Sequence, residues 1–67
     1  MKDEDEVKFY ALLEKIENLC RSRKELAISE IERMALEQGV RPTAILDELF
    51  IIEGMKVDLA RGKVTCQ

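Results

Sequence analysis

Histidine is absent from this chain of 67 residues, and its two cysteines, Cys20 and Cys66, do not form a C-x-x-C pair. A structural zinc site needs about four Cys or His ligands at short spacings, so we expect no metal site and no cofactor. The sequence also lacks the start of a secretory signal, which favours reduced thiols over a disulfide. We therefore predict that both cysteines are small buried side chains.

Groups that carry catalysis are also scarce. The serines are Ser22 and Ser29, and the chain has no histidine to activate either of them. The glycines are isolated from one another, so the sequence holds no glycine-rich loop that could bind a phosphate. Carboxylates are plentiful, but they alternate with Lys and Arg at spacings typical of surface ion pairs on helices. These absences predict that the chain is not an enzyme and has no small-molecule substrate.

Long apolar runs are missing too. No stretch approaches the roughly 18 apolar residues of a membrane span, and residues 1–6 are acidic where a signal peptide would be basic. With 46% hydrophobic and 37% charged residues, the chain is too apolar for a disordered tail. We expect a single domain over residues 1–67, soluble, cytoplasmic and without a membrane partner.

Helical spacing dominates the first third of the chain. Apolar residues recur three or four positions apart and predict a helix from about Asp5 to Arg21. The predicted buried stripe consists of Val7, Phe9, Tyr10, Leu12, Leu13, Ile16, Leu19 and Cys20. The polar, basic residues 21–24 interrupt the spacing and predict a loop, and residues 25–28 alternate as a short strand would.

Two further helices are predicted in the middle of the chain. Ser29 and Glu32 have the spacing of a capping box, which would start a helix that Gly39 can end. Pro42 lacks an amide hydrogen and therefore suits the first position of the next helix, which we expect to reach Ile52 or Glu53. The predicted inward residues of that helix are Ile45, Leu46, Leu49, Phe50 and Ile52, and its outward residues are Thr43, Asp47, Glu48 and Ile51.

Residues 56–59 and 63–66 alternate on either side of a loop that contains Gly62. They predict a β-hairpin in which Val57 and Val64 lie in two antiparallel paired strands. The expected fold class is mainly α, or α+β: a winged helix-turn-helix with three helices and a small β-hairpin as the wing. The predicted core consists of Leu13, Ile16, Ile31, Ile45 and Leu49.

Several segments, in this order, resemble the winged-helix superfamily. They are the end of the first helix at Leu19-Cys20, residues 28–31 (Ile-Ser-Glu-Ile), residues 35–40 (Ala-Leu-Glu-Gln-Gly-Val), residues 45–49 (Ile-Leu-Asp-Glu-Leu) and residues 61–64 (Arg-Gly-Lys-Val). Within that superfamily, the chain looks like the small C-terminal domain of archaeal minichromosome-maintenance (MCM) helicases. The resemblance implies a regulatory, non-catalytic module of DNA replication or transcription machinery, with the ATPase on another part of the polypeptide.

The charge pattern leaves two kinds of partner open. The net charge is −3, and the third predicted helix carries Asp47 and Glu48 outward, which argues against reading DNA bases in the major groove. The residues that could contact DNA weakly and without sequence preference are Arg21, Arg23 and Lys24 after the first helix and Lys56, Arg61 and Lys63 in the hairpin. The residues that could instead dock a protein partner are Thr43, Asp47, Glu48 and Ile51. A third possibility is a helical dimer in which the C-terminal segment is an unpaired tail.

Overall fold

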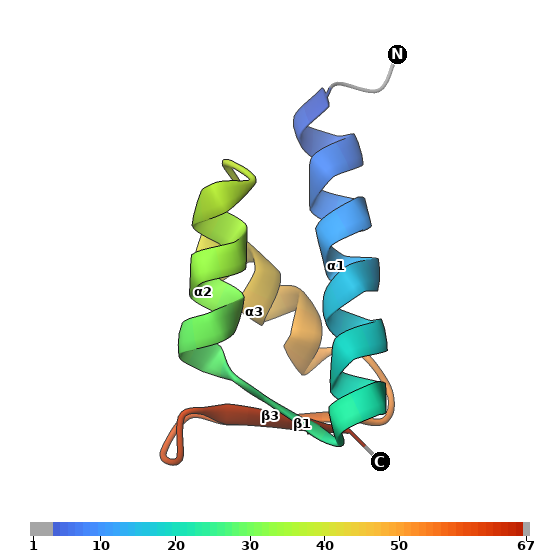
Figure 1. Cartoon of the computed structure of the whole chain (residues 1–67), viewed down its shortest axis with the longest axis vertical. Helices are drawn as coiled ribbons and strands as arrows, with labels where there is room; N and C mark the ends of the chain where they lie inside the picture. The colour runs from blue at the N-terminus through green and yellow to red at the C-terminus, as the bar shows by residue number, and fades with distance from the viewer. Residues whose placement is uncertain (1–3, 67) are drawn as a thin grey trace.

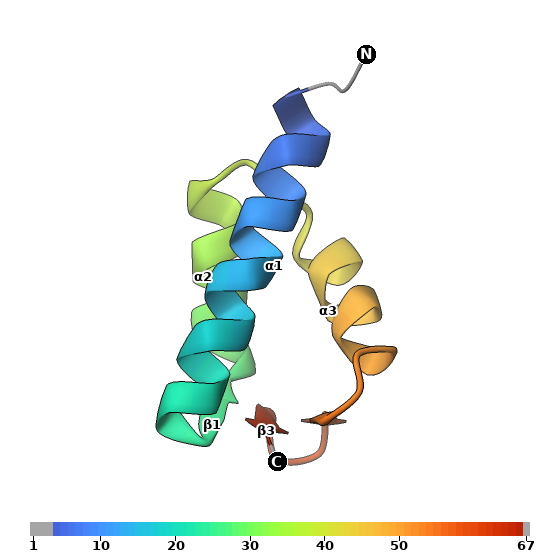
Figure 2. The ribbon, with the colours of Figure 1, turned by 90° about the vertical axis from the view of Figure 1, so that its right-hand side faces the viewer.

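The computed structural model describes residues 4–66. In chain order its elements are α1 (Glu4–Arg23), β1 (Glu25–Ala27), α2 (Ile28–Glu37), α3 (Pro42–Phe50), β2 (Met55–Asp58) and β3 (Lys63–Cys66). The helices stand together, and an antiparallel three-stranded sheet crosses one end of them (Figure 1, Figure 2). The prediction of an α+β chain with three helices and a β-hairpin is confirmed.

Helix α1 continues beyond its predicted end, so the loop predicted after Arg21 is wrong. Arg21 forms an ion pair of 3.4 Å with Glu17 one turn earlier, and Arg23 forms one of 3.0 Å with Glu30 of α2. Both cations also suit the last turn of a helix, where the helix dipole is negative. The chain turns at Lys24, whose φ of +73° is a left-handed conformation that non-glycine residues seldom adopt.

The start of α1 extends past the other helices (Figure 1). Val7 and Tyr10 were predicted to be buried, but 57% and 54% of their surfaces are exposed. The fully buried part of the stripe begins only at Leu12, where the helix meets the rest of the molecule. The spacing therefore predicted the correct face of α1 but not how far along the helix its neighbours reach.

Helix α2 starts at Ile28, so the predicted capping box is wrong. Ala27 occupies the N-cap position and makes no side-chain hydrogen bond to the helix, while Ser29 already lies inside the first turn. The amide of Ile28 instead donates a hydrogen bond of 2.9 Å to the carbonyl oxygen of Gly62. A loop distant in the sequence thus satisfies one of the free amides that every helix start exposes.

The turn between α2 and α3 follows the prediction. Gly39 has a φ of +72°, and Pro42 is the first residue of α3. The amide of Val40 donates to the carbonyl of Ala35 at 2.8 Å, which holds the turn against the end of α2. Helix α3 ends at Phe50, earlier than predicted, so the two residues expected to continue it lie in a turn that leads to β2.

β3 is the central strand of the sheet, with β1 on one side and β2 on the other. Val64 lies opposite Leu26 of β1 and opposite Val57 of β2. This confirms that Val57 and Val64 lie in two antiparallel paired strands. Because side chains alternate along a strand, these three form one row on the face turned to the helices, and Val64 is completely buried. Ile28, predicted to end the first strand, belongs to α2.

The predicted core is confirmed. Leu13, Ile16, Ile31, Ile45 and Leu49 are all buried in one cluster to which the sheet adds Leu26, Met55, Val64 and Cys66. Cys20 and Cys66 are buried free thiols, as predicted. Phe50 was predicted to point inward and is instead 53% exposed. Among residues 4–66, none of the helices combines the length and the apolar character needed to cross a bilayer.

Candidate interaction surfaces

The outward side of α3 forms the first candidate surface. Ile45 and Leu49 are completely buried, so the opposite side of the helix faces solvent. That side carries Thr43, Asp47, Phe50 and Ile51, all exposed, which we call the α3 outer face. Positions 43, 47 and 50 follow one another at helical spacings of four and three, which places them in one row.

The C-terminal end of this face is apolar. Phe50 is 53% exposed and Ile51 is 73% exposed, the highest fraction among the large hydrophobic residues of the described chain. The amide of Ile51 donates to the carbonyl of Glu48 at 3.2 Å, so the last turn of the helix fixes its backbone. Two adjacent apolar side chains exposed to water are a feature of surfaces that other molecules cover.

Charge on and beside the α3 outer face is of one sign. Asp47 is exposed in its middle, and Glu48 lies at its edge with intermediate exposure. The sequence of α3, Pro-Thr-Ala-Ile-Leu-Asp-Glu-Leu-Phe, contains no basic residue. The structure therefore brings together the four residues predicted for a protein partner, and Phe50, predicted among the inward residues, lies exposed beside them. Its position three residues after Asp47 and seven after Thr43 was the signal for it.

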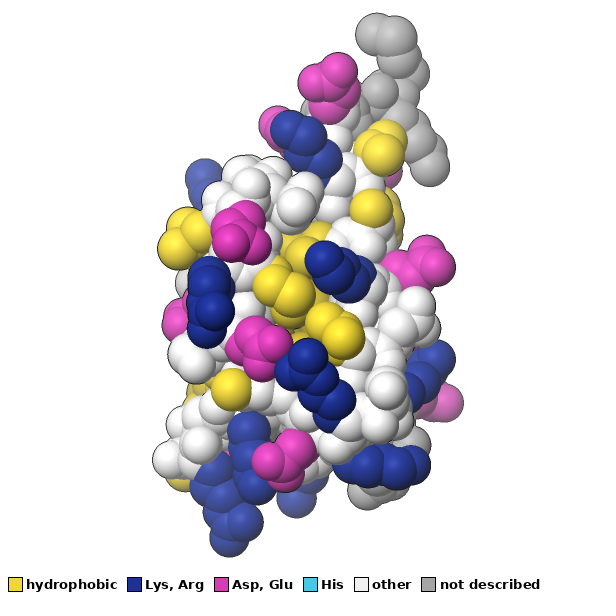
Figure 3. All heavy atoms as spheres, viewed as in Figure 1, with side chains coloured by type: hydrophobic (Ala, Val, Ile, Leu, Met, Phe, Trp, Pro, Cys, Tyr) yellow, Lys and Arg dark blue, Asp and Glu magenta, His cyan; other side chains and the backbone are white. Residues whose placement is uncertain are grey.

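The second candidate surface lies at the sheet end of the molecule, where the two predicted basic groups come together. Its residues are Arg21, Arg23 and Lys24 at the end of α1 and Lys56, Arg61 and Lys63 in the hairpin, which we call the basic end. They meet because β1 follows α1 directly and pairs with β3. Figure 3 shows Lys and Arg side chains gathered at this end, with acidic side chains between them.

Carboxylates neutralise most of the basic end. Arg61 pairs with Asp58 at 3.7 Å, and Lys63 pairs with Glu25 across the sheet at 3.1 Å. Two more cations, at positions 21 and 23, hold the ion pairs described for α1. Within residues 4–66, only Lys24 and Lys56 of this group have no ion pair.

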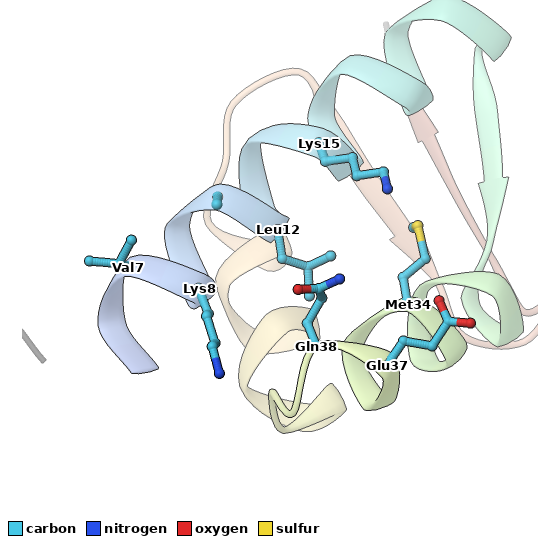
Figure 4. A pocket seen from close by; sticks show the side chains of 8 residues that line it. Val7, Lys8, Leu12, Lys15, Met34, Glu37 and Gln38 are labelled. Atoms are coloured by element: carbon cyan, nitrogen blue, oxygen red, sulfur yellow. The ribbon is translucent and has the colours of Figure 1, made fainter. Parts of the chain in front are cut away.

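A groove between α1 and α2 is the third feature of the surface. It has a volume of about 270 Å³. Its lining residues are Val7, Lys8, Ala11, Leu12 and Lys15 from α1 and Met34, Glu37 and Gln38 at the end of α2. Figure 4 shows these side chains along the two walls, and Figure 3 shows hydrophobic side chains between the two helices with charged ones around them. The wall residues carry both signs of charge, with Lys8 and Lys15 on α1 and Glu37 on α2.

Chemically reactive groups are few in the described part of the chain. Among residues 4–66, no group of three or more His, Cys, Asp or Glu side chains is placed to hold a metal ion. Burial raises the pKa of the Cys20 thiol from its ordinary 9.0 to about 11, and the neighbouring Cys66 adds to the rise. A nucleophilic cysteine has the opposite property, a lowered pKa that exposes a thiolate.

Comparison of the chain with protein-family models, with curated proteins and with solved structures finds no match. The function is therefore inferred from the three surfaces just described.

Proposed function

We propose that this chain is a non-catalytic winged helix-turn-helix module that binds a protein partner through the α3 outer face. The observation that carries the proposal is the exposed pair Phe50 and Ile51, next to Asp47 on a helix without basic residues. The order of elements supports the winged-helix interpretation: a helix, a strand, two helices and a hairpin, with the first strand added to the hairpin. In keeping with the resemblance, the module is an accessory part of DNA replication or transcription machinery.

The chemistry of the α3 outer face defines the partner. An aromatic and a branched aliphatic side chain at the end of a helix are anchors that fill an apolar groove, and such anchors contribute most of the affinity of an interface. Asp47, with Glu48 at the edge, favours Lys or Arg at the border of that groove. The partner surface is therefore apolar in its centre and basic at its border.

The same charges count against base reading by α3. A helix in the major groove places its outward side chains between two rows of phosphates, and affinity for DNA comes largely from cations that neutralise them. Asp47 on the α3 outer face, and Glu48 at its edge, would instead add repulsion.

An isotope-labelled sample titrated with a model partner tests the proposal. The probe is an amphipathic helical peptide with a leucine stripe bordered by Lys and Arg, and the matched control peptide carries Glu in their place. We expect amide shifts to concentrate at residues 43–51 with the basic peptide only, and the double substitution Phe50→Ser and Ile51→Ser to weaken binding about tenfold or more, as expected for hot-spot residues.

The control variant for that titration is Leu59→Ser. Leu59 is 64% exposed in the hairpin loop, so its substitution removes a similar apolar surface elsewhere. Equal weakening by both variants, or shifts that concentrate in the hairpin, would contradict a site on α3.

Weak contact with duplex DNA through the wing is the second candidate function. The observation that favours it is the convergence of six cations at the basic end, where Lys24 and Lys56 have no ion pair within the described residues. Exposed ion pairs contribute only about 0 to 1 kcal/mol, so Arg61 and Lys63 can exchange their carboxylates for phosphates. Asp58 and Glu25 stay close to any phosphate bound there, which keeps the affinity low.

A further inference from the structure

The two cysteines of the chain lie side by side in the fold. Cys20 is in the penultimate turn of α1 and completely buried, and Cys66 is at the end of β3 with 9% of its surface exposed. The Cys20 thiol donates a hydrogen bond of 3.6 Å to the carbonyl oxygen of Val64. Because Val64 and Cys66 are two positions apart on one strand, their side chains share the face turned to α1. The two thiols are close enough to influence each other, because Cys66 helps to raise the pKa of the Cys20 thiol.

Backbone contacts on both sides hold this pair in place. The amide of Cys66 donates a hydrogen bond of 2.9 Å to the carbonyl oxygen of Lys24, at the turn that follows α1. Strand β1 leaves the same turn and pairs with β3, where Leu26 lies opposite Val64. The end of α1 and the end of β3 are therefore fixed relative to each other by main-chain geometry, and the thiols meet without a mobile segment between them.

We propose that Cys20 and Cys66 form a reversible intramolecular disulfide when the chain meets a small-molecule disulfide such as oxidised glutathione. The thiolate of Cys66, the more exposed of the two, attacks one sulfur of the small molecule, forms a mixed disulfide and releases one thiolate. The thiolate of Cys20 then attacks the Cys66 sulfur and releases the second. The two protein thiols lose two protons and two electrons, and the small-molecule disulfide takes them up as two thiols.

The second step sets the rate. Attack needs the thiolate of Cys20, and its raised pKa keeps the group protonated near neutral pH. Of the titratable and charged groups beside it, Cys66 opposes ionisation and Arg21 favours it. Closure therefore speeds up as the pH rises toward the pKa of Cys20, and the buried pair is slow to react at neutral pH.

The bond would close a loop from residue 20 to residue 66, which contains the whole of β1, α2, α3 and β2. A cross-link of that span acts mainly by restricting the unfolded chain. Oxidation would thus lock the core without changing the α3 outer face, and reduction would leave a small domain that opens more readily.

The test uses the whole chain, incubated under native conditions with oxidised or with reduced glutathione. We expect the oxidised sample to lose two hydrogen atoms by mass, to yield a Cys20–Cys66 cross-linked peptide after digestion, and to melt about 10 °C or more above the reduced sample. The control variant Cys66→Ser should show no such rise. The cross-linked peptide is measured on the wild-type chain, so the test stands even if the variant folds poorly.

Three outcomes would overturn the proposal. They are a stable glutathione adduct at Cys66 with no internal bond, a disulfide that links two chains, and an internal disulfide that lowers the melting temperature. The last would mean that the bond distorts the native arrangement of the two cysteines.

Discussion

The amide of Ile28 donates a hydrogen bond of 2.9 Å to the carbonyl oxygen of Gly62, which joins the start of α2 to the hairpin loop. Gly62 holds a φ of +67°, a conformation that a side chain makes costly. Strain in the hairpin loop should therefore weaken the hydrogen bond at the start of α2.

We expect Gly62→Ala to lower the free energy of unfolding by about 1 kcal/mol through its left-handed backbone and to speed hydrogen exchange at the amide of Ile28. Gly54→Ala is the matched control, because Gly54 also has a positive φ, of +86°, but within residues 4–66 it makes no backbone hydrogen bond to α2. The control should lose similar stability and leave Ile28 protected. Equal exchange at Ile28 in both variants would show that the bond does not transmit the strain.

Ser29→Ala should hardly change stability. A capping serine contributes about 1 kcal/mol, and its replacement by Ala would cost that amount, but Ser29 lies within the first turn of α2 and makes no cap. Alanine is also the better helix former. The melting temperature of the variant should therefore equal that of the wild type or exceed it slightly. A loss of stability near 1 kcal/mol would instead show that Ser29 caps the helix.

Leu49→Ala should be among the most damaging single changes. Its side chain is completely buried between the helices and the sheet, and truncation of a buried leucine costs about 2 to 5 kcal/mol. Leu36→Ala on α2 is the control, because Leu36 is 69% exposed and should cost less than about 0.5 kcal/mol. Denaturant unfolding compares the two, and similar losses would mean that the inward face of α3 is assigned wrongly.

Duplex binding should separate the two candidate functions. If the basic end contacts DNA, affinity should be low, independent of sequence and steeply dependent on salt, with a slope near −0.9 per neutralised phosphate. Reversal of Arg61 and Lys63 to Glu should then abolish binding, while Asp47→Ala with Glu48→Ala should preserve or strengthen it. Titration of labelled duplex at low and moderate salt measures this.

The cations without ion pairs sharpen that experiment. Lys24 and Lys56 need not release a carboxylate before they meet a phosphate, so Lys24→Glu with Lys56→Glu should weaken binding at least as much as the reversal at the hairpin. If the chain does not bind duplex DNA at low salt, DNA contact is ruled out, and protein binding through the α3 outer face is the candidate function that is left.

Alkaline pH should weaken the fold through Cys20. Its thiol has a pKa of about 11 in the folded chain against 9.0 ordinarily, so between these values the unfolded state has released a proton that the folded state keeps. The free energy of unfolding should therefore be unaffected below pH 9 and fall by roughly 2 to 3 kcal/mol as the pH rises to 11. The variant Cys20→Ala should lack this fall in stability. If the free energy of unfolding depends on pH in the same way in both proteins, Cys20 is not its source.

Features that depend on neighbours in the sequence were predictable. Gly39 and Pro42 specify the turn before α3 through their own backbone preferences, and the alternation around Gly62 predicted the antiparallel strands that contain Val57 and Val64. These signals need no knowledge of the rest of the fold. The exposed residues on α3 were likewise accessible from helical spacing, although Phe50 was placed on the inward side.

Features that depend on distant parts of the chain were not predictable. The start of α2 was misplaced because its hydrogen-bond acceptor, at Gly62, belongs to the hairpin. The end of α1 was placed too early because Arg23 finds its partner, Glu30, on another helix. In the same way, the sequence gives no sign that Cys20 and Cys66 are neighbours, since only the packing of α1 on β3 brings them together.

The central position of β3 has a consequence for how the molecule assembles. β1 and β2 do not pair with each other, and each has only β3 as its neighbour. A chain that stops before Lys63 would therefore have no sheet at all, and Gly62, whose carbonyl accepts from the amide of Ile28, would be its last residue. Every contact that β3 makes with β1 closes a long loop, whereas its contacts with β2 close only a short one. The three-stranded sheet is therefore complete only when the last segment of the chain has joined β1.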